Sequence, residues 1–186
     1  MGSYDRNGWV VWAEIRTYIR MEKGFCYLVA IIDWYSRCIL SYRICTMLDV
    51  SFCIEALEEA LAKYPAPEIF NTDQGSQFTS AAFTEILITN NIQISMDGKG
   101  RASDNIIIER FFRSLKYENV YRYEYKSLPE LKMGIATYMN QYNFSRIHES
   151  LDYKTPASVY GILLKEVTSN NILVYAKRNQ LLKKAV

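Results

Sequence analysis

The sequence is poor in the residues and runs that several classes of site require. It contains a single histidine, His148, and four cysteines at irregular spacings without a Cys-x-x-Cys pair, so a structural zinc site is not expected. No apolar run approaches about 18 residues and no signal peptide is recognisable, which argues against a membrane-spanning or secreted protein. We expect buried free thiols, as in a reducing compartment, at all four cysteines: Cys26, Cys38, Cys45 and Cys53.

An excess of charge of one sign is also lacking, because the 186 residues carry a formal net charge of only +2. A surface that binds nucleic acid therefore has to come from local clustering of basic residues. Such a cluster lies between residues 99 and 132: Lys99, Arg101, Arg110, Arg113, Lys116, Arg122, Lys126 and Lys132. Interleaved tyrosines either stack on the bases of a DNA end or are half-buried residues of a strand or loop: Tyr117, Tyr121, Tyr123 and Tyr125.

The apolar share of the sequence, 49%, is that of a globular domain. Apolar runs and alternation predict strands at 8–21, 25–33, 38–44, 68–72 and 91–96, and the 3.6-residue period predicts helices at 50–63, 80–89, 105–117 and 127–142. Asp49 is expected to cap the first helix, whose buried face is predicted to hold Val50, Cys53, Ile54, Leu57 and Leu61. This order predicts an α/β fold in which helices flank a mixed sheet.

Two carboxylates occupy positions that suit a shared site. Asp73 directly follows the strand predicted at 68–72, and ligands of such folds gather at the carboxyl ends of strands. Glu109 is the only acid of the helix at 105–117 and shares one side of it with Arg113 and Lys116. An alternative reading of this side is a solvated face with an i,i+4 ion pair between Glu109 and Arg113. The core-facing arc of the helix is predicted to hold Ile107, Ile108, Phe111, Phe112 and Leu115.

The spacing of these two acids carries a family resemblance. Asp73 lies in NTDQGSQFTS and Glu109 in SDNIIIERFFRSLKYE, with 35 residues between the two acids and Lys116 seven residues after the second. Together with YNFSRIHESLDYKTPASVY, these segments resemble the integrase-type transposases of bacterial insertion sequences, relatives of retroviral integrase, over about residues 11–160. The resemblance implies a ribonuclease-H-like fold with a mixed five-stranded sheet flanked by helices.

The resemblance also implies metal-dependent DNA strand transfer. Asp73 and Glu109 match carboxylates that hold two Mg²⁺ or Mn²⁺ ions, which activate the attacking oxygen and stabilise the leaving 3′-oxygen. The implied partners are DNA, as transposon ends and as target, and further copies of the chain assembled on DNA. The implied location is a bacterial-type cytoplasm, at the nucleoid and away from membranes. The expected DNA contacts are Lys116, Arg113, Lys99 and Arg101, while His148 either contacts DNA or, as we favour, makes a structural hydrogen bond.

One carboxylate of the family pattern is missing. The resemblance predicts an aspartate on the first strand, in a pattern like Trp-x-x-Asp-x-Thr-Tyr, but the chain reads WAEIRTYIRM, with Ile15 at that position. Glu14 is adjacent, yet strand side chains alternate, so it becomes a metal ligand only if a bulge shifts the strand by one residue. Asp33 is a more distant substitute, for which turn stabilisation is the better role. We expect an impaired polynucleotidyl transferase or, alternatively, a catalytically inactive remnant that binds DNA or oligomerises.

The predicted organisation is a catalytic core over residues 1–160 and a basic C-terminal tail over 161–186, which holds five Lys or Arg and one Glu. Members of the family normally carry an upstream helix-turn-helix region that binds the ends of the element. Residues 1–8, MGSYDRNG, show no match to it, so the sequence is expected to lack that region. A ribonuclease-H-like nuclease acting on hybrids or junctions is a further reading, because it uses the same metals.

Overall fold

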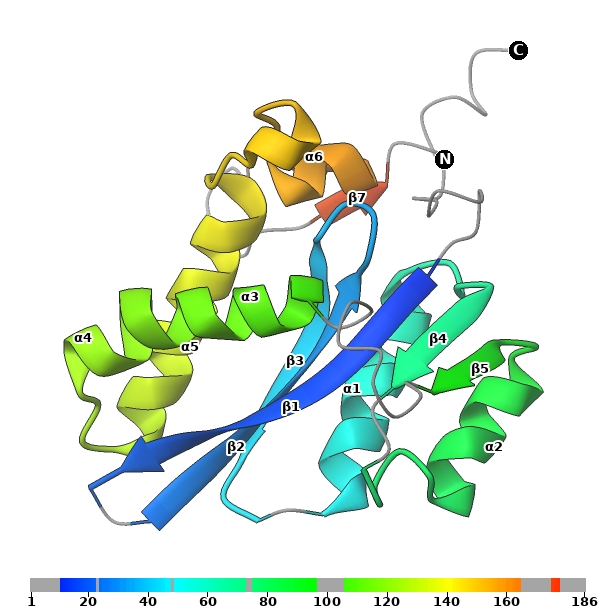
Figure 1. The fold of residues 1–186 in the computed structure, drawn as a ribbon, viewed down its shortest axis with the longest axis horizontal. Coiled ribbons are helices and arrows are strands. Elements are labelled where there is room, and N and C mark those ends of the chain that lie inside the picture. Colours follow the sequence, from blue (N-terminus) through cyan, green and yellow to red (C-terminus); the bar gives the residue numbers. More distant parts are fainter. Residues whose placement is uncertain are drawn as a thin grey trace.

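The fold is built on a single mixed sheet. The computed structural model describes residues 11–164 apart from 23, 48, 73–74 and 97–105, and also describes residues 175–177. The sheet runs in the order β3-β2-β1-β4-β5, with antiparallel pairing among β1, β2 and β3 and parallel pairing of β1 with β4 and of β4 with β5 (Figure 1). Its strands are β1 Val11–Met21, β2 Gly24–Asp33, β3 Ile39–Cys45, β4 Ile69–Thr72 and β5 Gln93–Met96. The predicted five-stranded mixed sheet is confirmed.

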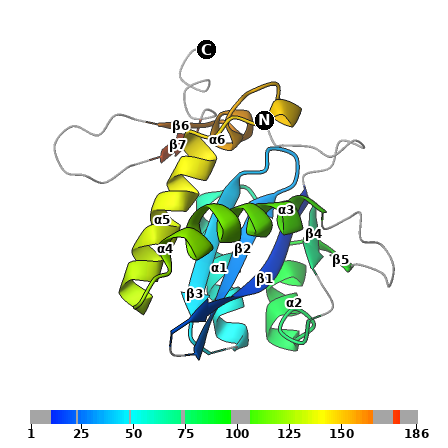
Figure 2. The ribbon, with the colours of Figure 1, turned by 60° about the vertical axis from the view of Figure 1, so that its left-hand side comes forward.

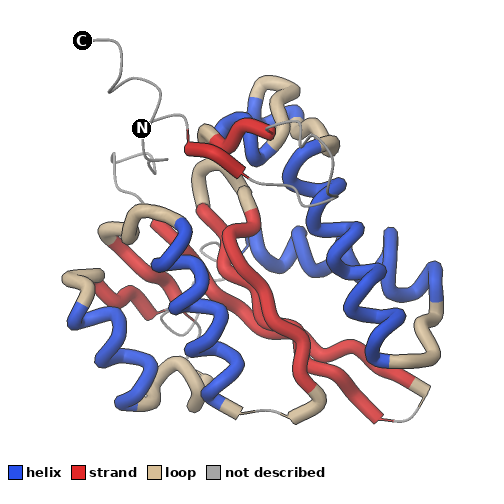
Figure 3. The backbone as a smooth tube through the Cα atoms, turned by 180° about the vertical axis from the view of Figure 1, so that it is seen from behind, coloured by secondary structure: helices blue, strands red, loops and turns tan. Residues whose placement is uncertain are grey.

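Helices cover both faces of this sheet. α1 (Val50–Lys63) and α2 (Ala81–Thr89) lie on one face and come to the front when the molecule is seen from behind (Figure 3). α3 (Ile106–Leu115) and α5 (Leu128–Phe144) belong to the other face (Figure 2). Since β2 is covered on both faces, its nearly continuous apolar run is explained by burial of both sets of its side chains.

Alternate residues of each central strand contribute to two separate cores. Trp12, Ile31 and Phe70 belong to the core under α1 and α2. Ala13 and Ala30 belong to the core under α3 and α5. The parity of a residue along β1 or β2 therefore tells which half of the molecule its side chain enters.

The face that α1 buries includes Cys53 and Leu57, as predicted, but its other fully buried residues were not predicted. Asp49 does cap the helix and accepts a hydrogen bond from the backbone N–H of Val50 at 2.6 Å. The residues that are buried are Phe52, Cys53, Ala56, Leu57 and Ala60, whereas Val50, Ile54 and Leu61 are only partly covered. The small side chain of Ala56 lets the helix backbone approach the sheet, and the Ser41 hydroxyl donates to the Ala56 carbonyl at 2.6 Å. A prediction based on large apolar residues missed this close approach.

The tyrosine-rich segment after α3 is helical as far as Tyr123, so a strand or loop is wrong up to that residue, whereas Tyr125 is a half-buried loop residue as predicted. α3 continues through a π-helical turn, Lys116–Val120, into α4, Tyr121–Tyr123, and Glu124 then adopts a left-handed conformation with φ 44°. Helical spacing places the rings of Tyr117 and Tyr121 edge to face at 5.5 Å, and both side chains are exposed.

Beyond α5 the chain forms a 3₁₀ turn, Glu149–Leu151, and α6, Pro156–Tyr160. Within the range predicted as a basic tail, β6 (Ile162–Leu164) pairs antiparallel with β7 (Tyr175–Lys177), and Ile162 is buried in the core under α1 and α2. All four cysteines are free thiols, as predicted, although Cys45 is only half-buried. In the described residues, no helix has both the length and the apolar character that crossing a membrane requires.

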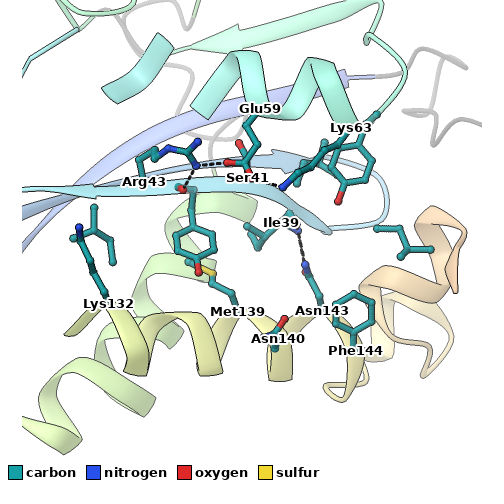
Figure 4. Close-up of a pocket in the computed structure, with 15 residues that line it drawn as sticks. Ile39, Ser41, Arg43, Glu59, Lys63, Lys132, Met139, Asn140, Asn143 and Phe144 are labelled. Carbon is teal, nitrogen blue, oxygen red and sulfur yellow. Dashed lines mark hydrogen bonds and ion pairs between the residues drawn. The ribbon is translucent and has the colours of Figure 1, made fainter. Parts of the chain in front are cut away.

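A side chain completes the hydrogen bonding of the outer edge of the sheet at β3. The buried Asn143 carboxamide accepts from the Ile39 N–H at 2.9 Å and donates to the Ile39 carbonyl at 2.8 Å (Figure 4). One residue of α5 thus satisfies both backbone groups that a sixth strand would otherwise pair with at this point.

We predict that Asn143→Ala lowers the free energy of unfolding by about 2 kcal/mol, because both backbone groups of buried Ile39 lose their partner. Urea denaturation measures the change. The control is Gln141→Ala on the exposed side of the same helix, expected to stay within about 0.5 kcal/mol of the unsubstituted chain. Equal losses in the two variants would show that α5 is sensitive to any truncation and that the edge bonds contribute little.

Candidate active site on helix α3

Helix α3 buries one side in the core and exposes a single acid, Glu109, on the other side. Ile108, Phe111, Phe112 and Leu115 are buried against the sheet and α5, which confirms the predicted core-facing arc; Ile107, the fifth residue of that arc, is half-buried. Glu109 therefore emerges on the opposite side, together with Arg113 and Lys116. These three residues are called the Glu109 side of α3.

The Glu109 carboxylate has no hydrogen-bond or ion-pair partner among the described residues. The alternative i,i+4 pair with Arg113 is not formed. Arg113 instead lies over the ring of Tyr117, with 5.9 Å between the guanidinium carbon and the ring centroid. The Lys116 ammonium lies 5.0 Å from the centroid of the Tyr18 ring on β1, and burial lowers the pKa of that ammonium. Both cations thus rest on aromatic rings, and the carboxylate remains available for another ligand.

The strand that precedes Asp73 ends beside the N-terminal half of β1. Thr72, the last residue of β4, is buried and pairs with Glu14 on one side and with Met96 on the other. Asp73 itself lies outside the described residues, as do Lys99 and Arg101. Their roles as metal ligand and DNA contacts therefore stay predictions.

The register of β1 decides which face Glu14 occupies. Glu14 is directly opposite Ile31, a member of the core under α1 and α2, and its own side chain is wholly buried. The pairing of β1 with β2 and with β4 runs without a register shift, so the bulge that Glu14 would need as a metal ligand is not present in these ladders. Glu14 consequently lies on the face of the sheet opposite α3 and Glu109.

Position 15 has the other parity. Its backbone partner on β2 is Ala30, and Ala30 belongs to the core under α3 and α5. Residues directly opposite one another in an antiparallel pair share a face of the sheet. The position at which the family pattern has an aspartate is therefore on the α3 face, and this chain has isoleucine there.

Asp33 has the structural role that the sequence favoured. Its wholly buried carboxylate accepts from the Ser36 backbone N–H at 2.8 Å and from the Ser36 hydroxyl at 2.5 Å, which fixes the turn between β2 and β3. These contacts tie the carboxylate to the turn.

The chemistry of these donors fits a divalent cation only in part. Carboxylate oxygens are the ligands that Mg²⁺ prefers, and an exposed, unpaired Glu109 on a firmly packed helix is a suitable one. Within the residues that the structure describes, no three His, Cys, Asp or Glu side chains gather closely enough to hold a metal. A metal site here needs Asp73 beside Glu109, and Ile15 supplies no oxygen to it.

A wider groove lies elsewhere on the described chain and has no free carboxylate for catalysis. It has a volume of about 650 Å³ and follows the edge of β3 between α1 and α5 (Figure 4). Its carboxylate, Glu59, is ion-paired with both Arg43 and Lys63. The rest of the lining includes one further charged residue, Lys132, and no second carboxylate, so the groove offers no free acid.

His148 is held in place by backbone hydrogen bonds. Its N–H donates to the Lys154 carbonyl at 3.2 Å, and its carbonyl accepts from the N–H groups of Leu151 and Tyr153 at 3.0 Å each. Its ring lies edge-on to Tyr142 with 5.2 Å between centroids. The structural bonds that we favoured are thus made by the backbone of His148 rather than by its ring.

Solved structures with a similar fold are retroviral integrase cores. The catalytic core domain of HTLV-2 integrase, in a dimeric form with magnesium, matches with a TM-score of 0.64 and 21% identity over 81% of this chain and 95% of that one. The simian T-cell lymphotropic virus intasome in complex with a PP2A regulatory subunit matches with a TM-score of 0.71 and 16% identity over 96% of this chain and 63% of that one. The fold is therefore ribonuclease-H-like, the class that the sheet order and flanking helices define.

Sequence comparison then narrows this class. An integrase core domain model matches residues 8–102, and a second integrase core domain model matches residues 90–156. The chain belongs to the integrase core domain family.

Individual relatives are transposases of bacterial insertion sequences. The chain is 34% identical over 149 residues to the transposase of IS904 from Lactococcus lactis, which is 78% of this chain and 59% of that one. It is 30% identical over 148 residues to the transposase of IS629 from Shigella sonnei, 79% of this chain and 50% of that one. It is 33% identical over 140 residues to transposase InsF of IS3A from Escherichia coli, 74% and 49%. The chain thus spans about half the length of the curated relatives it matches.

The ring of His148 is predicted to make stability depend on pH. Burial, and next the nearby Arg37 and Arg146, lower the pKa of this imidazole in the folded chain. The pKa of the imidazole in the unfolded chain is about 6.5, so below that pH the unfolded state binds more protons than the folded state. The contribution of His148 to the free energy of unfolding is therefore fully present above this pH and is lost as the pH falls through the folded-state pKa. We expect His148→Gln to lose less free energy of unfolding than the unsubstituted chain between pH 7 and 5, measured by urea denaturation. Identical losses would contradict a buried, neutral imidazole.

Proposed function

We propose that the chain is the catalytic core of a DNA transposase, which joins 3′ ends of an element to target DNA with the help of Mg²⁺ or Mn²⁺. The observation that carries the proposal is the free Glu109 carboxylate on α3. This helix packs on the face of the sheet on which the family pattern places the aspartate of β1. Transposases are also what the relatives at 30–34% identity are named.

Asp73 and Glu109 are proposed to hold the metal ions together. Asp73 follows β4 directly in sequence, and the parallel pairing of β4 with β1 brings the last residue of β4, Thr72, beside Glu14, one residue before position 15. When bound, two divalent ions activate the attacking oxygen and stabilise the leaving one. The contribution of the chain is positioning, since β1, β4 and α3 are packed elements rather than loops. Lys116, Arg113, Lys99 and Arg101 are proposed to contact the DNA backbone near these acids.

The same geometry supports an impaired site. Position 15 pairs with Ala30, a residue of the core under α3 and α5, and isoleucine has no oxygen for a metal ion; the nearest acid along the strand, Glu14, lies on the other face. We propose that Glu14 is not a ligand and that metal affinity rests on Asp73 and Glu109 alone. The alternative function, a catalytically inactive remnant that binds DNA or self-associates, is favoured by this one substitution.

Assembly on DNA is proposed from the same relationships. One structural relative is described as an intasome and another as a dimeric integrase core, so this chain is proposed to bind both element ends and target DNA as a multimer. The proposed site of action is the bacterial cytoplasm, at the nucleoid.

We predict that Ile15→Asp raises strand transfer of pre-processed DNA ends in Mn²⁺ by roughly 100-fold, because it restores an oxygen ligand on the α3 face. A gel assay with labelled ends measures the products. Comparable transfer by the unsubstituted chain would overturn the impaired-site proposal, and no transfer by either chain favours the remnant.

Three further variants in the Ile15→Asp background assign the ligands. We expect Asp73→Asn and Glu109→Gln to abolish the restored transfer, since each removes a ligand charge. Glu14→Gln is the matched control, because it changes a carboxylate one residue away on the opposite face, and we expect it to leave transfer within about twofold. If Glu109→Gln leaves transfer intact, the proposed site is wrong whatever Glu14→Gln does.

A further inference from the structure

A second polar pocket lies on another side of α3. It has a volume of about 300 Å³ and is enclosed by the β2–β3 turn, α3, the C-terminal end of α5 and the 3₁₀ turn that follows. Figure 1 shows these segments gathered on the side of α3 toward α6. One acid, Glu149, lines it, and its other polar lining residues are Arg37, Arg110, Ser114, Tyr142, Arg146, His148 and Ser150. This site is called the arginine pocket.

Helix α3 separates the arginine pocket from the candidate active site. At about 100° per residue, the stripe of Ile107, Arg110 and Ser114 lies roughly 120° around the helix from the Glu109 side. The arginine pocket is therefore not part of the metal site. Arg37, in the turn before β3, and Arg146, in the segment just after α5, complete it from distant parts of the chain.

The charge of the arginine pocket is only partly neutralised. Arg146 is ion-paired with Glu118 outside the lining. Arg37 and Arg110 form no ion pair with any described residue, and Glu149 is the one acid of the lining. Three guanidinium groups, each with several donors in a planar fork, suit an oxyanion such as phosphate better than they suit one another.

Arg37 is held in an uncommon backbone conformation. Its φ of 61° lies in the left-handed region, which costs free energy for any residue with a Cβ atom. The turn enforces it, because the Arg37 N–H donates to the Asp33 carbonyl at 2.8 Å and the Asp33 carboxylate holds Ser36. Glycine or asparagine would relieve the conformation at this position. Local strain at a charged side chain that lines a pocket is a pointer to function.

The ring of His148 adds a buried nitrogen atom that lacks a partner. Its Nε2 atom is buried and makes no hydrogen bond to any described residue. A buried polar atom without a partner is costly, and in the tautomer with the proton on Nε2 this nitrogen would donate to an anion oxygen bound in the pocket that His148 lines. Two hydroxyls, from Ser114 and Ser150, offer further donors in the same pocket.

We propose that the arginine pocket binds a phosphate group of the DNA backbone, at a place distinct from the phosphate that reacts. Its preference for phosphate rests on the pocket alone, whereas the choice of DNA as the source of that phosphate rests on the proposed function. DNA would then contact α3 on two sides, at the Glu109 side and at the arginine pocket. The helix would hold the reacting phosphate at a fixed position relative to a second phosphate of the DNA.

The test is DNA binding without metal, measured by fluorescence anisotropy of a labelled duplex in EDTA. Arg37→Gly and Arg110→Ala are each expected to weaken binding roughly fivefold and to reduce the slope of log affinity against log salt by about 1, the effect of one lost phosphate contact. Lys63→Ala is the matched control, since it removes one positive charge on α1, across the sheet, and we expect unchanged affinity. Equal effects of all three variants, or none, overturn the proposal.

Arg37→Gly also separates function from folding. Because glycine tolerates the left-handed conformation, the melting temperature of the Arg37→Gly variant is expected to equal or exceed that of the unsubstituted chain, while its affinity for DNA falls. Weaker binding accompanied by a lower melting temperature would point to a damaged turn and count against the pocket. Arg110→Ala, on a helix surface, provides the independent second reading.

Two outcomes identify the source of the phosphate. If inorganic phosphate raises the melting temperature of the unsubstituted chain but not of Arg37→Gly, while DNA affinity is the same for both, the pocket holds a small phosphate and the DNA assignment is wrong. If DNA affinity falls as predicted while strand transfer by Ile15→Asp does not depend on Glu109, the pocket stands and the proposed catalytic site fails.

Discussion

Strand β1 is hydrogen-bonded on both sides, to antiparallel β2 and to parallel β4, and these two ladders together allow only one register. A shift by one residue would bring Trp12 from the core under α1 and α2 into the core under α3 and α5, and would exchange every other side chain of the strand in the same way. The assignment of each residue of β1 to a face is therefore as strongly determined as the hydrophobic core itself.

This constraint gives the acids of the chain their different roles. Glu14 and position 15 are neighbours in sequence but belong to opposite halves of the molecule. Asp33, at the end of β2, is tied to Ser36 in a turn. The packing of α3 leaves Glu109 exposed and unpaired among the described residues. Its basic neighbours Arg113 and Lys116 contact aromatic rings instead of this carboxylate.

Those features that depend on local pattern were predictable from sequence. The apolar run of β2, the 3.6-residue period of α3 and the cap of α1 are each encoded within a few adjacent residues. The buried face of α1 was not, because Ala56 and Ala60 are central only through their contact with a sheet formed elsewhere in the chain. The helical state of the segment after α3 was missed for a similar reason, since Tyr125 and Asn119 hydrogen-bond to each other and Val120 packs in the core.

The candidate site also has features that the sequence reveals and features that only the structure reveals. The 35-residue spacing of Asp73 and Glu109 is visible in the sequence, as is the isoleucine at position 15. The freedom of the Glu109 carboxylate was not visible, because it depends on Arg113 and Lys116 turning to aromatic rings. The arginine pocket was missed altogether, since Arg37 and Arg146 are more than a hundred residues apart and carry no motif.

The bond between Asn143 and Ile39 has a consequence for how the sheet ends. An exposed edge strand invites pairing with a strand of another molecule, and proteins that leave such an edge open risk aggregation. Here a carboxamide from 104 residues further along the chain occupies the place of the incoming strand. Any local opening of α5 near its C-terminal end would therefore uncover β3 at the same moment, which couples the solubility of the protein to the stability of a single helix.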